Sequence, residues 1–217
     1  MAYSFTAANS RYLSTTSTPA TAAPLTISCW GNLPSLTPVQ TLVSIESGNS
    51  NDIFLLYAFT GTQLAFFTQR QGGAFGDTGG GFNFSANTWF NAIAVERAVN
   101  SRSLYLNGGT VIGGSERTNT TNTGAPAVSR IAIGGRYYSG SLGGYANGLI
   151  AEVGIWNVEL TESERVSLAR GMTCDKVRPQ SLVFYAPLVR DLIDAKGGLT
   201  ITNNNGATVA NHTRVYA

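Results

Sequence analysis

Short segments in which apolar and polar positions alternate recur along most of the chain. Between residues 149 and 156, one alternating set of positions is apolar throughout, which is the pattern of a β-strand with one face against a core. Comparable segments predict strands near residues 2–6, 25–31, 39–47, 52–59, 63–70, 89–96, 102–106, 129–134, 147–156 and 182–187. Strands of this length and spacing are typical of an all-β chain folded as a two-sheet antiparallel β-sandwich.

One short α-helix is predicted near residues 162–170. Thr161 and Glu164 have the spacing of a capping box, in which the threonine hydroxyl accepts a hydrogen bond from the Glu164 backbone N–H and the glutamate carboxylate reaches back. Gly171 follows as a stop signal. The sequence therefore sets both ends of this helix.

Asparagine and glycine mark two turns. The turn Asn107-Gly108-Gly109 predicts a tight hairpin between strands at residues 104–106 and 110–112, and a structural role for Asn107. The segment from Gly197 onward carries a second such turn at residues 203–206, and it reads either as a last hairpin or as an arm that reaches a neighbour.

The strand that begins at Gly148 and the helix after it read G-x-I-x-E-V-x-I-W-N, then x-L-T-x-x-E and a glycine. Matching segments occur at residues 3–5 with 10–13, 25–30, 89–95 and 103–108. Together they resemble laminin-G-like domains, members of the concanavalin A-like lectin/glucanase superfamily. The resemblance implies a concanavalin A-like jelly roll over residues 1–190, with residues 191–217 as a C-terminal hairpin or arm packed on the sandwich or on a neighbour.

Composition narrows the class of partners. Only 12% of the residues are charged, about half the share of average soluble proteins, and the net charge of +2 comes from scattered basic residues. No apolar run approaches the length of a membrane span, and the first ten residues lack the basic region and apolar core of a signal peptide. We therefore expect no nucleic-acid partner, no membrane insertion and synthesis in the cytoplasm without a signal peptide.

The two cysteines and the single histidine bear on redox and metal chemistry. A bridge between Cys29 and Cys174 would tie the helix exit to the sandwich, whereas two small buried thiols suit synthesis in the cytoplasm better. Zinc is disfavoured because His212 stands far from both cysteines. No cofactor is predicted, although backbone carbonyls could complete a calcium site beside Asp191 and Asp194, so calcium stays open.

The sequence predicts a protein that is not an enzyme. Glucanases of the resembling superfamily place two acids close together on one strand, as in E-x-D-x-E, and this pattern is absent. Glu46, Glu96 and Glu152 are each solitary on their predicted strands, and Glu152 is better suited to a structural hydrogen bond or a metal ligand. No catalytic residue is assigned, and glycoside hydrolysis ranks lowest among the functions considered.

Three predicted loops are long enough to carry a binding site. The glycine-rich loop at residues 71–81 lacks the lysine and helix of a phosphate cradle, and the polar loop at residues 113–127 shows no chemical pattern. The loop at residues 134–147 carries tyrosines on glycine hinges, which suit the stacking of sugar rings. The candidate glycan surface comprises Arg136, Tyr137, Tyr138, Tyr145, Asn147 and, from the first loop, Asp77. The alternative is that these tyrosines cover the end of the sandwich or a protein neighbour.

Fold, surface and resemblance together suggest a location. Stand-alone laminin-G-like proteins that lack a signal peptide and are rich in Thr, Asn and Gly are similar to phage virion proteins. The leading hypothesis is a virion surface structural protein (a capsid decoration, head fibre or tail-associated protein) that contacts other virion proteins in a symmetric or homo-oligomeric assembly and binds host cell-surface glycans. The second hypothesis is a free-standing carbohydrate-binding lectin module that uses calcium.

Overall fold

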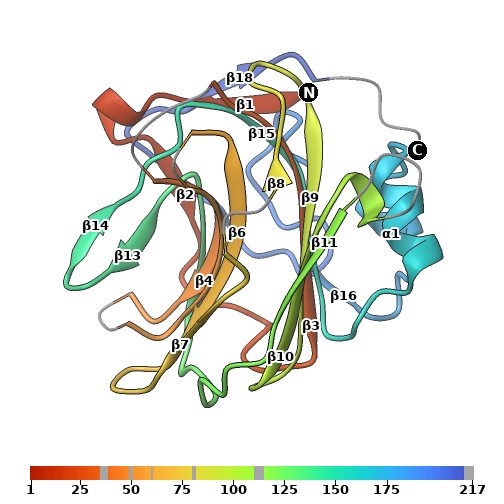
Figure 1. Ribbon diagram of the computed structural model, residues 1–217. Coiled ribbons are helices and arrows are strands. Elements are labelled where there is room, and N and C mark those ends of the chain that lie inside the picture. Colours follow the sequence, from red (N-terminus) through yellow and green to blue (C-terminus); the bar gives the residue numbers. More distant parts are fainter. Residues whose placement is uncertain (35–38, 49–50, 60, 80–81, 110–114, 213–217) are drawn as a thin grey trace.

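The computed structural model describes residues 1–34, 39–48, 51–59, 61–79, 82–109 and 115–212, and within them two antiparallel β-sheets face each other (Figure 1). The first sheet contains β1 (Ala2–Phe5), β3 (Leu25–Asn32), β9 (Phe90–Ala98), β10 (Ser101–Leu106), β11 (Ser115–Asn119), β15 (Gly148–Trp156), β16 (Leu182–Ala186) and β18 (Thr208–Ala210). The order of its strands is β11-β10-β9-β3-β15-β1-β18, and β16 pairs with β15.

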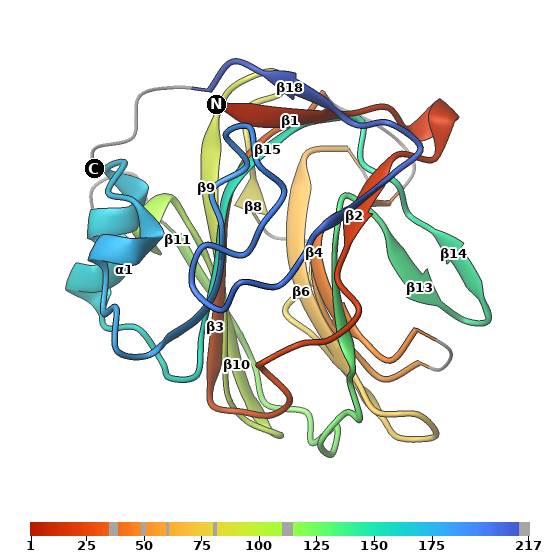
Figure 2. The same ribbon diagram turned by 180° about the vertical axis from the view of Figure 1, so that it is seen from behind.

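The second sheet contains β2 (Tyr12–Ser14), β4 (Gln40–Glu46), β5 (Ile53–Ala58), β6 (Gln63–Gln69), β7 (Phe75–Asp77), β8 (Phe82–Asn83), β12 (Arg130–Ile133) and β17 (Thr202–Asn204). The order of its strands is β17-β2-β12-β4-β5-β6-β7, and β8 pairs with β6. A separate hairpin, formed by β13 (Arg136–Tyr138) and β14 (Ser141–Gly143), lies beside the second sheet and away from the first (Figure 2). This arrangement is the predicted two-sheet antiparallel β-sandwich.

Apolar side chains from both sheets fill the space between them. On β5 the alternate residues Phe54, Leu56 and Ala58 belong to this core, and Ile27 of β3 and Leu104 of β10 reach it from the first sheet. Their burial stabilises the sandwich by about 25 cal/mol for each Å² of apolar surface removed from water.

The helical segments are η1 (Ala7–Asn9), η2 (Asn107–Gly109), α1 (Glu162–Ala169) and η3 (Cys174–Lys176). Helix α1 covers the outer face of the first sheet, where Trp156 and Leu168 belong to a second, smaller apolar cluster. The Trp156 indole Nε1 donates a hydrogen bond to the Val177 carbonyl oxygen at 2.8 Å, so the polar edge of this buried ring is satisfied.

Helix α1 begins with the predicted capping box. The Thr161 hydroxyl accepts from the Glu164 N–H at 3.4 Å, and the Thr161 N–H donates to the Glu164 carboxylate at 2.7 Å. The structure thus confirms the helix near residues 162–170.

We expect Thr161→Ala to lower the free energy of unfolding by about 1 kcal/mol, because a helix N–H loses its side-chain acceptor. In a thermal melt followed by circular dichroism, this corresponds to a decrease in Tm of about 2–4 °C. Thr21→Ala, which changes an exposed threonine outside the regular elements, is the matched control. Equal Tm values for the two variants would contradict the expectation.

Each of the ten strands predicted from the alternating segments is present, and its ends differ from prediction by at most two residues. The strands that were not predicted are β2, β7, β8, β11, β13, β14, β17 and β18. Each has five residues or fewer, too few for a periodic pattern to stand out. The three predicted loops are accordingly corrected, because residues 71–81 contain β7, residues 113–127 contain β11 and residues 134–147 contain the β13–β14 hairpin.

The predicted tight hairpin after β10 is also corrected. Residues 110–112, the expected second strand, lie outside the described residues, and the strand that pairs with β10 is β11, with Leu106 opposite Ser115. Asn107 does have a structural role, because its side-chain Oδ1 accepts from the Asn91 backbone N–H at 3.0 Å and ties the turn to β9.

The C-terminal segment adds one strand to each sheet. Strand β17 pairs with β2 in the second sheet, and β18 pairs with β1 in the first. Between them, the Asn203 side chain accepts from the Ala207 N–H and donates to its carbonyl oxygen, both at 2.8 Å. Residues 202–210 therefore bridge the two sheets instead of pairing with each other as a hairpin.

The two cysteines are both free and buried. The Cys174 thiol donates to the Glu152 carbonyl oxygen at 3.5 Å, and burial raises the pKa of both thiols. Cys29 and Cys174 therefore do not form the disulfide that was the alternative.

A buried ion pair joins the sheets at one edge. Arg102 of β10 donates from Nε and Nη2 to the Glu96 carboxylate of β9, each at 3.0 Å, and the two side chains are 0% and 1% exposed. Thr68 of β6, in the second sheet, donates to the same carboxylate at 3.0 Å. Gly76 of β7 lies so close that a side chain there would collide with Arg102 Nη1. The guanidinium therefore occupies space that the second sheet leaves free for it.

Candidate functional site

The outer face of the second sheet carries a third apolar cluster. On β5 the residues between the core positions, which include Leu55 and Tyr57, point outward and pack with Phe67 of β6 and Val39. A strand that is apolar on both faces is normally covered on both. Here the cover is partial, because Phe59 at the end of β5 is 42% exposed.

The β13–β14 hairpin extends over one side of this face. The Tyr137 backbone N–H donates to the Glu46 carboxylate at 2.7 Å, and the Tyr138 hydroxyl donates to Gln69 Oε1 at 2.8 Å. At the turn, the Ser139 N–H donates to Asn51 Oδ1 at 2.7 Å. These bonds to β4, β6 and the loop before β5 fix the hairpin against the sheet.

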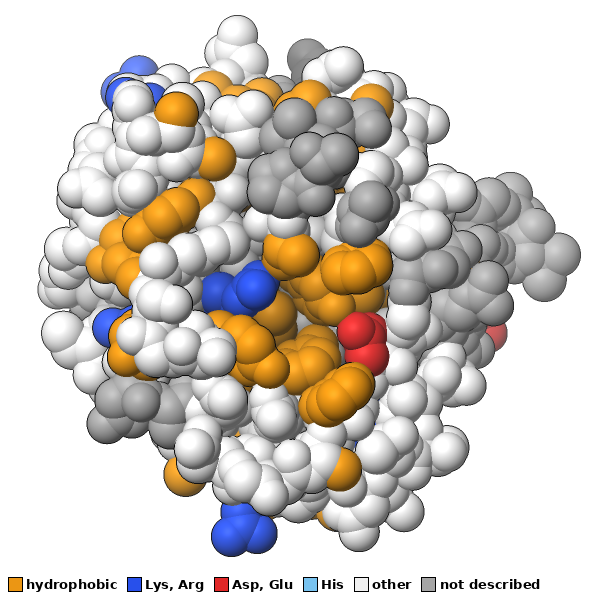
Figure 3. Space-filling model, turned by 60° about the vertical axis from the view of Figure 1, so that its left-hand side comes forward, with side chains coloured by type: hydrophobic (Ala, Val, Ile, Leu, Met, Phe, Trp, Pro, Cys, Tyr) orange, Lys and Arg blue, Asp and Glu red, His pale blue; other side chains and the backbone are white. Residues whose placement is uncertain are grey.

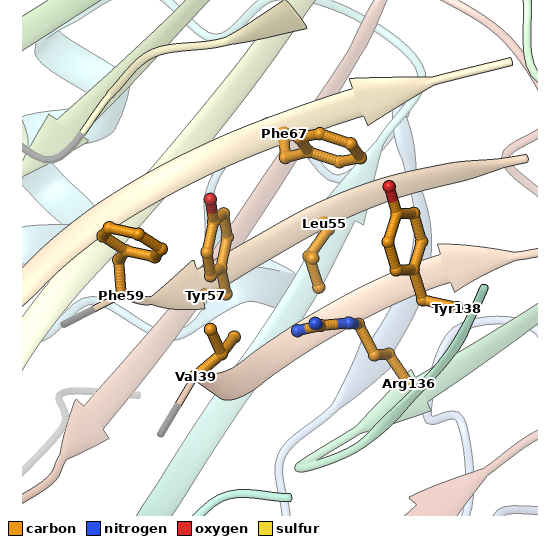
Figure 4. Close-up of a pocket in the computed structure, with 7 residues that line it drawn as sticks. All are labelled: Val39, Leu55, Tyr57, Phe59, Phe67, Arg136 and Tyr138. Atoms are coloured by element: carbon orange, nitrogen blue, oxygen red, sulfur yellow. The ribbon is translucent and has the colours of Figure 1, made fainter. Parts of the chain in front are cut away.

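A pocket of about 150 Å³ lies between the hairpin and the sheet. Its walls are formed by Val39, Leu55, Tyr57, Phe59, Phe67, Arg136 and Tyr138 (Figure 4). On the surface, it is a hollow rimmed by apolar side chains, with basic and acidic groups at its edges (Figure 3).

The aromatic rings of the pocket hold one another in place. Phe67 meets the Tyr138 ring edge-on, with centroids 5.7 Å apart and planes at 89°, and it stacks on Phe75 at 5.7 Å and 25°. Tyr57 and Phe59 also meet edge-on at 6.2 Å. Phe75 is 60% exposed, so the aromatic surface continues beyond the pocket. We name these five rings the aromatic platform.

Arg136 places a cation in this apolar setting. In Figure 4 its guanidinium lies next to the tip of Leu55, between the Tyr57 and Tyr138 side chains, and its Cζ is 5.5 Å from the Tyr138 ring centroid. Nη1 is buried and has no hydrogen-bond partner among the described residues. Burial lowers the pKa of Arg136, and the tyrosines and Glu46 oppose this shift.

Asp77 stands on the other side of Tyr57. The Tyr57 hydroxyl donates to Asp77 Oδ2 at 2.8 Å, and the Gly79 N–H donates to Oδ1 at 2.8 Å. Burial, followed by the charge of Asp77, raises the pKa of Tyr57, so this hydroxyl stays protonated. The aromatic platform thus lies between a cation and a carboxylate.

The candidates Arg136, Tyr138 and Asp77 come together here, whereas the other three predicted residues lie elsewhere. Tyr137 does not line the pocket and contributes through its backbone N–H. Tyr145 packs on Tyr12, with ring centroids 6.1 Å apart, and the Asn147 backbone N–H donates to Gln40 Oε1 at 2.8 Å. On a strand, neighbouring side chains point to opposite faces, which separates Tyr137 from Tyr138.

Sequence reasoning missed the apolar and aromatic residues that the second sheet and its edges contribute to the pocket, which are Val39, Leu55, Tyr57, Phe59 and Phe67. The signal was the continuous apolar run at residues 53–59, which contains no polar position to face water. Such a run predicts a covered or ligand-binding outer face.

The three solitary glutamates each have a partner. Glu46 pairs with Arg130 at 2.7 Å, Glu96 belongs to the buried ion pair, and Glu152 accepts from the Tyr185 hydroxyl at 2.7 Å. Burial raises the pKa of Glu152 to about 7, although the bond from Tyr185 lowers it. The predicted structural hydrogen bond of Glu152 is present.

Within the described ranges, no cluster of three or more His, Cys, Asp or Glu side chains could hold a metal ion. None of the helices in those ranges is long and apolar enough to cross a membrane.

Comparisons with known proteins bear on the family and the fold. A family model described as the concanavalin A-like lectin/glucanases superfamily matches residues 7–164, more than half of the chain. A sequence search of curated proteins finds no match.

Several solved structures have a similar fold. A candidate carbohydrate-binding protein from Bacteroides ovatus is 18% identical with a TM-score of 0.66; the match covers 95% of this chain and 58% of that protein, so this chain spans little more than half of its length. The heptameric SAP-like pentraxin from Limulus polyphemus is 16% identical with a TM-score of 0.62, over 95% and 93% of the two chains. The enzymatically active domain of tailspike protein 2 from bacteriophage CBA120 is 14% identical with a TM-score of 0.58, over 85% and 29%.

Proposed function

The chain belongs to the concanavalin A-like lectin/glucanases superfamily, and we propose that it is a non-catalytic domain that binds carbohydrate on the aromatic platform of its second sheet. The observation that carries the proposal is the pocket itself, where aromatic rings and polar tips converge on an outer face that is only partly covered. Rings of this kind stack on the C–H faces of sugars, while Arg136, Asp77 and the tyrosine hydroxyls suit hydrogen bonds to their oxygens.

The engagement of the glutamates supports a non-catalytic role. Retaining glycosidases need two carboxyl groups about 5–5.5 Å apart. Glu46 is held by Arg130, and Glu96 by Arg102, while Glu152 lies on β15 in the other sheet from the pocket. Neither ion-paired carboxylate is free to act as a nucleophile or as an acid.

We expect Tyr138→Ala to weaken glycan binding by about tenfold or more, because it removes a ring of the platform, and tenfold corresponds to about 1.4 kcal/mol. Tyr137→Ala is the matched control, since it deletes the neighbouring tyrosine side chain, which does not line the pocket. The measurement is a glycan-array screen of the purified proteins with and without Ca²⁺, followed by titration of the best ligand.

Two results of this screen would contradict the proposal. One is silence across the array for the unsubstituted protein. The other is equal weakening by Tyr137→Ala and Tyr138→Ala, which would place the binding surface elsewhere. Binding only with Ca²⁺ present would favour the calcium-dependent lectin module instead.

The proposed setting is a virion surface, with other virion proteins as partners in a symmetric assembly. Two observations favour it: the low charge of 12% and the likeness in fold to a phage tailspike domain. A virion component should copurify with particles or self-associate. A free-standing lectin module should be monomeric in light scattering, which would count against this setting.

A further inference from the structure

The Arg136 guanidinium forms no salt bridge in the part of the chain that the structure describes. Glu46, whose charge acts on Arg136, and Asp77 are each held by other partners. Glu46 accepts from Arg130 at 2.7 Å and from the Tyr137 N–H at 2.7 Å, and Asp77 accepts from the Tyr57 hydroxyl and the Gly79 N–H. Arg102, which is enclosed between the sheets, is by contrast hydrogen-bonded through Nε, Nη1 and Nη2 to Glu96 and its neighbours. A buried donor such as Arg136 Nη1 that lacks an acceptor among the described residues disfavours the folded state.

The surroundings of Arg136 hold it in this position. A Cβ atom at Gly144 would lie 2.8 Å from Arg136 Nη1 and 3.1 Å from Thr41 Oγ1, so both polar atoms lie next to this glycine. Thr41 is 0% exposed, and its Oγ1 also lacks a partner among the described residues. Arg136 also lines the pocket, and its guanidinium lies among the pocket side chains in Figure 4. Two unpartnered polar groups, Arg136 Nη1 and Thr41 Oγ1, therefore lie beside Gly144.

The remaining walls suit a single sugar ring. A volume of about 150 Å³ equals roughly five water molecules at their liquid volume, which fits one ring and not a chain of them. Asp77 does not line the pocket, but it accepts from the Tyr57 hydroxyl, and a carboxylate has further lone pairs with which it can accept from a hydroxyl group. The exposed Phe59 and Phe75 then provide a surface for the next sugar of a chain.

We infer that the pocket receives an acidic sugar at the end of a glycan, with its carboxylate bound by Arg136 and its ring on the aromatic platform. A carboxylate matches the planar fork of guanidinium donors, which makes such pairs stronger than bonds to neutral oxygens. The inference deepens the proposed function and rests on it, because it names the class of sugar that the same pocket selects.

The test uses pairs of glycans that differ in the carboxylate. Isothermal titration calorimetry of the full chain compares 3′-sialyllactose with lactose, and trigalacturonic acid with its methyl ester. We expect at least one acidic member to bind about tenfold or more tightly than its neutral partner, and this preference to weaken as salt increases.

Three variants assign the preference to one side chain. Arg136→Gln should abolish the preference and leave weak neutral binding, while Arg136→Lys should retain part of it, because the charge stays but the fork is lost. Arg190→Gln removes the same charge from an exposed residue that does not line the pocket, and should change nothing. A thermal melt of each variant checks that it is folded.

The outcomes separate the inference from the proposed function. Equal affinity for acidic and neutral partners, with loss of both in Tyr138→Ala, would overturn the inference and leave the carbohydrate-binding function standing. A preference that survives in Arg136→Gln would overturn it as well. If no glycan binds in either this titration or the array, both the inference and the proposed function are overturned.

Discussion

Replacing Arg102 with methionine is expected to lower the free energy of unfolding by about 3–5 kcal/mol, the largest effect of any substitution considered for this chain. The Glu96 carboxylate is then left without its counter-ion between the sheets, where its exposed fraction is 1%. Burial raises the pKa of Glu96 even with Arg102 present, so the carboxyl group should take up a proton once the arginine is gone. The destabilisation should therefore be larger at pH 8 than at pH 5.

The measurement is urea denaturation followed by tryptophan fluorescence. The double variant Arg102→Met/Glu96→Leu is the control, because it removes both charges and should lose less stability than Arg102→Met alone. A loss below about 1 kcal/mol for Arg102→Met, typical of an exposed ion pair, would contradict a structural role for this pair. Arg97 and Glu159, which are 30% and 41% exposed, form such a pair for comparison.

The second large effect concerns the pH dependence of stability. Glu152 is 4% exposed, and its pKa of about 7 in the folded protein exceeds the ordinary value of 4.5. Below pH 4.5 the group is protonated in both states; between 4.5 and about 7 it ionises only on unfolding; above about 7 the folded protein carries the buried charge. Its contribution to stability is thus full at low pH and is lost as pH rises, by about 3 kcal/mol in total at about 1.4 kcal/mol per pH unit.

The variant Glu152→Gln isolates this contribution. Gln stays neutral and still accepts from Tyr185, so its stability relative to the unsubstituted protein should rise by about 3 kcal/mol between pH 4.5 and pH 8. The effect must be measured as the difference in unfolding free energy between the two proteins at each pH. This is because burial lowers the pKa of His212 to about 4, and that shift makes stability rise with pH, opposite to the effect of Glu152. Parallel pH profiles for the two proteins in urea titrations would show that Glu152 carries no such penalty.

Several groups surround Glu152 and bear on that shift. Burial is the largest cause, and Asp175 raises the pKa further. The Tyr185 hydroxyl and the N-terminal ammonium group lower it. Removing the ammonium charge by acetylation should therefore raise the pKa and extend the pH range over which stability falls.

Prediction from the sequence succeeded where a pattern is local and long enough to repeat. The capping box needs only Thr161 and Glu164, whose spacing places both on the first turn of the helix. The long strands repeat their alternation several times. Strands such as β7 and β13 have three residues each, which is too short for a repeated alternation. They form because they pair with β6 and β14, and such pairing is not visible in a local pattern.

Of the candidate site, only the residues in segments predicted as loops could be identified from the sequence. Arg136 and Tyr138 stood out because they lie between glycines in a polar segment. Tyr57 and Phe67 did not, because an apolar run shows that a strand is covered on both faces without showing what covers each face. The outer face of the second sheet is only partly covered because the β13–β14 hairpin extends over one side of it. Hydrogen bonds from the hairpin to Glu46 and Gln69 fix this position.

The pairing of β1 with β18 has a topological consequence. Ala2 lies opposite Ala210, so the chain enters and leaves the described fold at neighbouring points. Domains with adjacent ends tolerate circular permutation and insertion into a loop of a host protein. A connection between Ala2 and Ala210 would lie beside strands that already pair in the first sheet, whereas the pocket lies on the second sheet. The domain could thus be inserted into a loop of a host protein through its adjacent ends, with the aromatic platform facing solvent.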